Sequence, residues 1–203
     1  MVKNMKYKNF LSIVAIGTIL SFMIASCKNE TKEYAESPVA VTKQNVENEI
    51  THGKYLVDIM GCNDCHSPKR IGEKGPEIIP ELLLSGYPSE RPVINFDSPL
   101  LKEGFGMFYP DLTAAAGPWG ISFAGNLTPD ETGIGNWTEE QFKIALTKGK
   151  FKGLENARTL LPPMPWLNYV EMKDEDISAI FKYLKSIEPV VNIVPPPVSP
   201  ADM

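Results

Sequence analysis

The chain has 203 residues, of which 43% are hydrophobic, so it is long enough for one modest domain with a buried core and additional tails. Its formal net charge of -5 argues against a nucleic-acid-binding surface, because such surfaces are basic. Eighteen prolines and fifteen glycines predict many loops and few long helices or strands.

The first 26 residues have the pattern of an export signal. Three lysines precede an apolar run over residues 10–24, and the segment contains no acidic residue. At fifteen residues the run is short for a membrane-spanning helix. It leads into Ile-Ala-Ser-Cys at residues 24–27, which resembles the lipobox of bacterial lipoproteins. We therefore expect a lipoprotein signal peptide over residues 1–26, with an uncleaved N-terminal anchor as the alternative.

Cleavage before Cys27 would leave its thiol to carry lipid. The chain would then be exported as a membrane-anchored lipoprotein facing the periplasm or the cell surface, since more than one acyl chain holds a protein firmly on a bilayer. Loss of three lysines with the signal leaves 17 basic residues against 25 acidic ones, so the mature chain is more acidic still. Cys62 and Cys65 are the remaining thiols, and no spare thiol is left for a disulfide.

The rest of the chain divides by composition into a tether, a domain and a tail. Residues 28–48 are polar and lack a sustained apolar period, so residues 27–48 are predicted to be a lipidated flexible tether. The folded domain is expected over residues 49–190. The prolines near the end predict a proline-rich tail over residues 191–203.

Three helices are predicted within the domain. The first contains Gly53, which is costly inside a helix and indicates close approach by another element. The second begins with a capping box formed by Thr138 and Gln141. They are expected at about residues 49–60, 139–148 and 174–187.

The segments between these helices are less regular. Residues 67–122 are rich in glycine and proline, which predicts loops with short helical or extended pieces. Residues 161–169 contain three prolines within four positions, so this segment is predicted to be stiff and extended.

Cys62, Cys65 and His66 form a Cys-x-x-Cys-His motif, which fits covalent attachment of one haem c. The two thiols add across the two vinyl groups of the porphyrin, and the adjacent imidazole binds the iron. Two alternatives remain open. A structural zinc site needs four ligands, and beyond carboxylates only His52 is left to complete one. A redox dithiol is expected in a thioredoxin-like βαβ context, which this sequence does not predict.

A haem iron needs a sixth ligand or has an open position. Met164 is the favoured ligand, because a thioether is a soft donor and the prolines on both sides restrict its backbone. Met107 is the runner-up, and His52 would give a bis-histidine site.

The second ring nitrogen of His66 is expected to donate to a backbone carbonyl and so to fix the ring. The carbonyl of Pro76, in Lys-Gly-Pro, or of Pro68 is the predicted acceptor. The alternative for either proline is an ordinary turn.

With these pieces placed, the chain resembles a class I cytochrome c. The resemblance implies a mainly α fold in which a long irregular insertion separates the haem-attachment motif from the methionine loop. It also implies that the two terminal helices cross at a glycine and an aromatic residue, for which Gly53 and Tyr183 are the candidates. The 98 positions from His66 to Met164 must wrap the haem.

Three segments are similar to the cytochrome subunits of membrane-bound alcohol and aldehyde dehydrogenases and to single-domain lipoprotein relatives. They lie at residues 125–142, 162–166 and 174–187. The resemblance implies that Asn126, Trp137 and Arg158 meet the haem propionates. Two departures are clear: those subunits carry several haem motifs and this chain one, and Lys173 replaces the usual capping threonine or serine, so Asp174 is expected to cap.

The expected function is one-electron transfer, not catalysis, because an iron bound by imidazole and thioether has no position for a substrate. The expected partners are redox proteins: a donor dehydrogenase or quinol oxidoreductase and a terminal acceptor. Two alternatives stay open. One is a haem enzyme or gas sensor with an open or labile sixth position, and the other is a haem subunit held in a dehydrogenase or respiratory complex.

Overall fold

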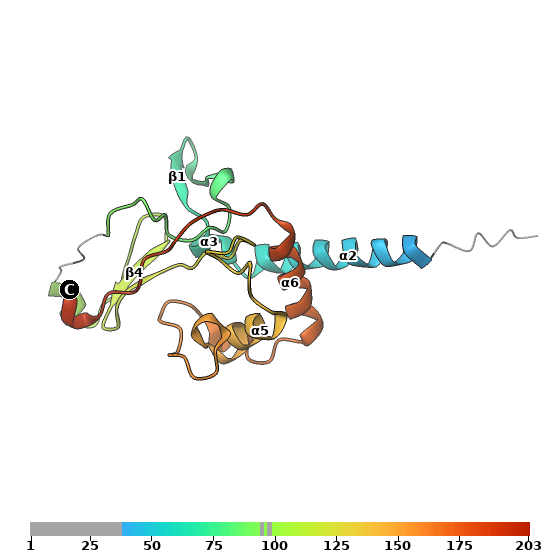
Figure 1. The fold of residues 1–203 in the computed structure, drawn as a ribbon. Helices are drawn as coiled ribbons and strands as arrows, with labels where there is room; N and C mark the ends of the chain where they lie inside the picture. The colour runs from blue at the N-terminus through green and yellow to red at the C-terminus, as the bar shows by residue number, and fades with distance from the viewer. Residues whose placement is uncertain (1–37, 94–95, 97–98) are drawn as a thin grey trace, which may run out of the picture. The chain divides into compact units, whose positions relative to one another are not determined.

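The structure is a computed structural model that describes residues 38–93, 96 and 99–203, with side chains from residue 42 onward. In this part of the chain helices predominate and the strands form two small antiparallel sheets, which confirms the mainly α prediction in its coarse form (Figure 1). No helix among these residues is long and apolar enough to pass through a bilayer.

The α-helices are α2 (Pro38–Ile59), α3 (Cys62–His66), α4 (Pro99–Lys102), α5 (Glu139–Lys148) and α6 (Asp174–Ser186). The strands are β1 (Lys69–Gly72), β2 (Gly75–Ile78), β3 (Met107–Phe108), β4 (Ala114–Gly117) and β5 (Gly120–Phe123). Four 3-10 helices lie between or after them: η1 (Pro80–Leu82), η2 (Phe151–Gly153), η3 (Trp166–Tyr169) and η4 (Pro200–Asp202).

Helix α2 begins well before the predicted start at residue 49. Residues 38–48, which were assigned to the tether, are helical. Proline is favourable at the first position of a helix, where its missing N–H is not needed, and Pro38 occupies that position. Residues 42–49 are exposed, so this half of the helix has no buried face and shows no apolar period.

Helices α2 and α6 cross at Gly53. A Cβ atom at this position would lie 1.9 Å from the carbonyl oxygen of Ala179, so only glycine lets the two backbones approach so closely. Tyr183 is buried in the core cluster beside the crossing. The close approach predicted for Gly53 is therefore confirmed. The buried members of this cluster, called the main core here, are Val57, Leu84, Ile134, Phe142, Leu146, Ile177, Ile180, Tyr183 and Leu184.

Helix α5 has the predicted ends. The Thr138 hydroxyl accepts from the Gln141 backbone N–H, the Gln141 side chain accepts from the Thr138 N–H, and Gly149 closes the helix with φ of 61°. The Trp166 ring covers Gly149, where a Cβ would lie 2.3 Å from the indole. Helix α5 thus packs against η3, the 3-10 helix that begins two residues after Met164.

Helix α6 begins without a side-chain cap. Lys173 occupies the capping position but its side chain makes no capping hydrogen bond. Asp174 lies inside the helix and pairs with Lys143 of α5 at 2.7 Å, so the expectation that Asp174 caps α6 is wrong. The three acidic residues of the first turn still complement the positive end of the helix dipole.

The insertion between α3 and α5 is more regular than predicted. Strands β1 and β2 form a hairpin, and β3, β4 and β5 form a second antiparallel sheet. Strand β4 is Ala-Ala-Ala-Gly and is buried throughout, so it shows no alternation of apolar and polar residues. Strands of two to four residues are also too short for such a period to appear.

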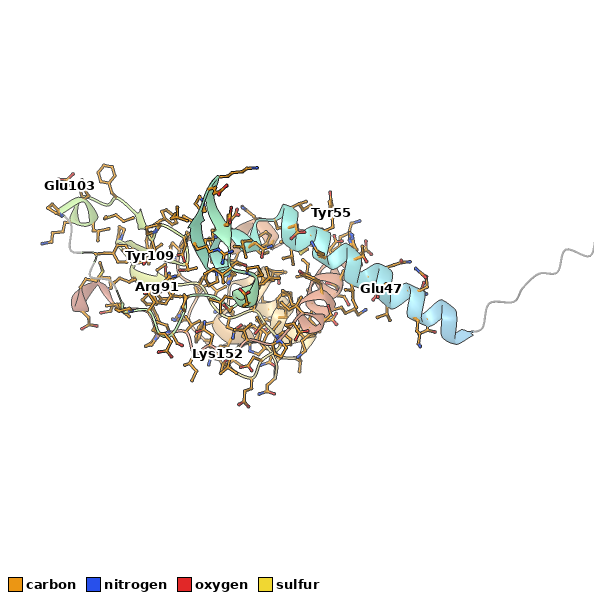
Figure 2. The ribbon with its side chains drawn as sticks, turned by 90° about the horizontal axis from the view of Figure 1, so that it is seen from above. Glu47, Tyr55, Arg91, Glu103, Tyr109 and Lys152 are labelled. Carbon is orange, nitrogen blue, oxygen red and sulfur yellow. The ribbon has the colours of Figure 1, made fainter. Side chains whose placement is uncertain are left out.

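An ion pair inside the insertion connects its loops. The Arg91 guanidinium donates to Asp111 at 2.9 Å, and the Asp111 side chain is almost fully buried. Figure 2 shows Arg91 beside Tyr109, and the guanidinium lies 4.5 Å from the centre of that ring. Asp111 also accepts from the hydroxyl of Thr113 at 2.6 Å. The carboxylate therefore has the partners that a buried charge requires.

The segment after α6 is packed against the insertion. Residues 187–203, called the C-terminal strap here, run from α6 to the sheet of β3, β4 and β5 (Figure 1). Val198 pairs with Ile121 of β5 in antiparallel register, with N···O distances of 2.9 and 3.0 Å. The segment predicted to be a tail is thus a bound part of the fold.

Candidate haem-binding site

Helix α3 carries both thiols and the imidazole on little more than one turn. Gly61 precedes it with φ of 71°, a left-handed conformation that lets the chain turn sharply out of α2. Cys62 and Cys65 are three residues apart, which places them on one side of the helix. Both are free and half-buried, so both are available for thioether formation.

Burial keeps these two cysteines in the thiol form. It raises the pKa of Cys62 to about 11 and also raises the pKa of Cys65. A redox Cys-x-x-Cys motif has a lowered thiol pKa. The raised pKa of both thiols therefore does not fit a redox dithiol.

The His66 ring is fixed by Gly125. Its Nδ1 lies 2.7 Å from the Gly125 carbonyl oxygen. A carbonyl can only accept, so Nδ1 carries the proton and Nε2 keeps its lone pair for a metal. Burial lowers the pKa of His66, which favours the neutral imidazole that a metal needs.

The predicted acceptors of the His66 proton, Pro76 and Pro68, are wrong. Pro76 is exposed in strand β2 of the hairpin. The carbonyl of Pro68 accepts instead from the N–H of Ile79 at 3.0 Å. Gly125 lies 59 residues from His66, and no sequence signal points to such a distant acceptor.

Lys69 holds the C-terminal end of α3, a role that the sequence did not indicate. Its ammonium donates to the Asp64 carbonyl at 2.7 Å and to that of Ser67 at 3.1 Å. It also reaches the carbonyls of Asn63 at 3.3 Å and Asp111 at 3.1 Å. A positive charge at the end of a helix satisfies free carbonyls and opposes the negative end of the dipole.

Met164 and Cys62 of α3 are both partly buried, and both pack against the main core. Tyr169, in the 3-10 helix after Met164, has a pKa raised first by burial and further by the nearby thiols of Cys62 and Cys65. Tyr169, in the 3-10 helix that follows Met164, therefore lies near the two thiols of the motif.

The other two ligand candidates lie elsewhere. Met107 is in β3 and packs against a second cluster around Phe96 and Ala116. His52 pairs with Asp176 of α6 at 2.7 Å, on the exposed side of the helix crossing. Among the described residues no three His, Cys, Asp or Glu side chains gather as a metal cluster.

The three propionate candidates have different surroundings. Asn126 is buried, and its amide already donates to the Val190 carbonyl at 2.8 Å and the Thr132 hydroxyl at 3.2 Å. The Asn126 amide therefore has a structural role and is not a free donor. Arg158 lies over the Phe151 ring at 4.2 Å and is exposed. Trp137 is partly buried and packs against the main core.

The donor set of the site fits a haem c. It consists of two neutral thiols on one turn, a neutral imidazole whose Nε2 lone pair is not protonated, and a partly buried thioether that packs against the same core cluster as Cys62. The sequence predicts these four residues as the haem-binding set. It missed the residues that position them, which are Gly125, Lys69 and the asparagines of the strap contacts described below.

Comparisons with known proteins point to cytochrome subunits. The chain is 27% identical over 189 residues to the fructose dehydrogenase cytochrome subunit of Gluconobacter japonicus, which covers 92% of this chain. It is 38% identical over 77 residues to the gluconate 2-dehydrogenase cytochrome c subunit of Pantoea cypripedii. It is 39% identical over 75 residues to the cytochrome c subunit of the quinone alcohol dehydrogenase of Gluconobacter oxydans (strain 621H).

The matches are partial. The chain spans 30% of the fructose dehydrogenase subunit, and the other two matches cover 37% and 36% of this chain and 17% and 15% of those subunits. No family model matches the chain. The relatives are named as cytochrome subunits, which are electron carriers and not catalytic subunits. The resemblance seen in the sequence is thus confirmed: this chain is similar to the cytochrome subunits of fructose, gluconate and alcohol dehydrogenases.

Proposed function

We propose that this protein is a one-electron carrier with one haem c, attached covalently through Cys62 and Cys65. His66 and Met164 are the proposed axial ligands, in a fold of the class I cytochrome c type. The observation that carries the proposal is the His66 ring, whose Nδ1 is held by Gly125, so that Nε2 keeps its lone pair, in the helix that carries two free thiols. The relatives named as cytochrome subunits support it.

The bound haem would supply the one-electron chemistry, and the residues of the chain set its surroundings. Gly125 fixes the imidazole tautomer, and Lys69 places a positive charge next to the helix that bears the motif. The main core excludes water from the side of Cys62 and Met164. Burial and a thioether ligand both favour the reduced state and so raise a reduction potential.

Visible spectra of the exported protein test this function. We expect a ferric spectrum of a six-coordinate, low-spin haem with the weak far-red band of a thioether ligand. The variant pair Cys62→Ser and Cys65→Ser should lose covalent attachment. A high-spin ferric spectrum with fast cyanide or carbon monoxide binding would favour the haem enzyme or gas sensor instead.

A second candidate is a haem subunit held in a dehydrogenase complex. It is favoured by the names of the relatives, each of which is a subunit of a dehydrogenase. The partners of the carrier would then be a fixed donor dehydrogenase and a mobile acceptor. Affinity purification of the full chain from its own membranes distinguishes the two: a stoichiometric catalytic subunit supports the complex, and an isolated haem protein supports the free carrier.

We further propose that the protein is a lipoprotein anchored through Cys27 on the outer side of a membrane. Cys27 and the signal segment lie outside the described residues, so the proposal rests on the sequence pattern. The variant Cys27→Ser should leave the membrane fraction without losing the haem spectrum. Retention of this variant in washed membranes would contradict lipid anchoring.

A further inference from the structure

We propose that Asn192 of the C-terminal strap is a positioning residue for His66. The inference rests on the proposed function, because His66 is a ligand only if the protein binds haem. Asn192 does not touch His66. It acts through two short segments that grip the backbone and the ring of the histidine.

The first step is the clamp around His66. The Gly86 N–H donates to the His66 carbonyl at 2.8 Å, and the Gly125 carbonyl accepts from the ring at 2.7 Å. The two glycines are packed closely, since a Cβ on Gly86 would lie 2.6 Å from the Gly125 oxygen. The Tyr87 N–H also donates to the Ala124 carbonyl at 2.9 Å. Segments 85–87 and 124–126 therefore form one unit, called the histidine clamp here.

The second step is the grip of Asn192 on one side of the clamp. Its Nδ2 donates to the carbonyls of Ser85 at 2.7 Å and Tyr87 at 2.9 Å, the two residues that flank Gly86. Its Oδ1 accepts from the Ser89 N–H at 2.8 Å. Asn192 is 6% exposed, and its bonds to Ser85 and Tyr87 are buried, whereas the bond from Ser89 is partly buried. Movement of this amide would move the Gly86 N–H directly.

The third step ties the same strap to the other side of the clamp. Asn126 follows Gly125, and its Nδ2 donates to the strap carbonyl of Val190 at 2.8 Å. The Asn192 N–H donates in turn to the Thr132 hydroxyl at 2.9 Å, and Thr132 also accepts from Asn126. The strap thus holds both segments of the clamp, at 85–87 and at 124–126.

The chemistry of the position requires an amide. Asn192 uses two donors and one acceptor at once, which a carboxylate or a hydroxyl of similar size cannot do. A carboxylate would face two carbonyl oxygens without a proton and leave them unsatisfied in a buried site. The neighbouring Val191 and Ile193 are 78% and 71% exposed, so the strap turns only the asparagine inward here.

The test compares Asn192→Asp and Asn192→Ser with the control Ile193→Ser in the exported full chain. Three measurements are made: the g values of the ferric haem, the midpoint potential, and hydrogen exchange of the Gly86 N–H. We expect both Asn192 variants to shift the g values and the potential, because these report the orientation of the imidazole. Hydrogen exchange of the Gly86 N–H should accelerate by at least about tenfold, because the variants lose the buried hydrogen bond from Asn192 to the Ser85 carbonyl in the same peptide unit. The control should match the wild type in all three.

The outcomes separate this inference from the proposed function. A wild type without haem overturns the proposed function, and the inference with it. A wild type with haem, and Asn192 variants that melt at lower temperature but keep its g values and potential, overturn the inference alone, because Asn192 is then only structural. If Asn192→Asp does not accumulate, Asn192→Ser decides, since its smaller side chain retains one donor and introduces no charge.

Discussion

At the scale of single residues, the site is built from neutral donors. The pKa of Cys62 is raised to about 11 by burial, and burial lowers the pKa of His66. Thiols and imidazole are therefore uncharged at neutral pH before anything binds. A neutral site avoids the cost of burying unpaired charges and needs no proton release from the imidazole when a metal binds.

Removal of the Met164 thioether should change the haem spectrum. In Met164→Ala we expect loss of the far-red band, appearance of high-spin ferric haem and a lower midpoint potential, because the sixth position opens. Met107→Ala is the matched control, since Met107 packs against the second cluster away from Cys62. Absorption spectra and potentiometric titration make the comparison. An unchanged spectrum in Met164→Ala together with a changed one in Met107→Ala would reverse the assignment.

The sequence predicted the candidate site residues but not the contacts that hold them in place. Cys62, Cys65 and His66 are adjacent in the chain, so a local motif is enough to find them. The acceptor of the His66 proton is 59 residues away and the strap asparagine that grips Ser85 is 107 residues away. Such contacts depend on the tertiary fold, and the partners are backbone carbonyls that any residue provides.

At the scale of elements, Lys69 connects α3 with the loop at Asp111. In Lys69→Met the stem is kept and the ammonium is lost, so the four carbonyls that share its three N–H groups lose this partner. We expect a loss of about 1–3 kcal/mol in the free energy of unfolding. Urea unfolding measures it, with the exposed neighbour as control in Arg70→Met. If the two variants had the same free energy of unfolding, the prediction would be wrong, because water would then replace the ammonium with no loss of stability.

The crossing of α2 and α6 should not tolerate a methyl group. Alanine at Gly53 would gain about 1 kcal/mol in helix propensity. However, its Cβ would lie 1.9 Å from the Ala179 oxygen, and overpacking of this severity costs about 3 kcal/mol or more. Gly53→Ala is therefore expected to lower the melting temperature of the protein, whereas Tyr55→Ala, at an exposed site of the same helix, should not. A stabilised Gly53→Ala variant would contradict the close crossing.

The sequence predicted elements well where local signals are strong. The capping box and closing glycine bound α5, and an acidic first turn marks α6. The small strands were missed because β4 is buried on both faces and β3 has two residues. The first half of α2 was missed because it buries no apolar stripe, although Pro38 suits a first helical position.

At the scale of the whole molecule, the ion pair in the insertion should contribute to acid stability. Burial alone would raise the pKa of Asp111, but hydrogen bonds from Arg91 and Thr113 outweigh it and the pKa is lowered from its usual value of 3.8. Ionised Asp111 therefore adds stability that is complete above about pH 4 and is lost as the pH falls through the lower folded-state pKa.

The variant Asp111→Asn tests this pH dependence. Its melting temperature should fall at neutral pH and should change less than that of the wild type between about pH 4 and pH 2. Glu103→Gln, at an exposed position, controls for the loss of one carboxylate. Parallel curves for the wild type and Asp111→Asn would contradict the assigned role of Asp111.

In the part of the chain that the structure describes, segments distant in sequence surround the haem motif. The strap returns from α6 to the insertion and pairs with β5, so the segment that composition marks as a tail completes the fold. Its prolines predict an extended path correctly, but extended segments can be bound or free. Whether such a segment is bound depends on its partners in the fold. Here the strap is held by hydrogen bonds between buried side-chain amides, those of Asn126 and Asn192, and backbone carbonyls.

The central claim is that one haem is bonded covalently to Cys62 and Cys65. The most direct test extracts the purified exported protein with acidified acetone and records the pyridine haemochrome spectrum of the protein residue. The account predicts that the iron porphyrin stays with the protein and gives the band of a haem with both vinyl groups saturated. A porphyrin that passes into the acetone, or a colourless protein, would contradict it.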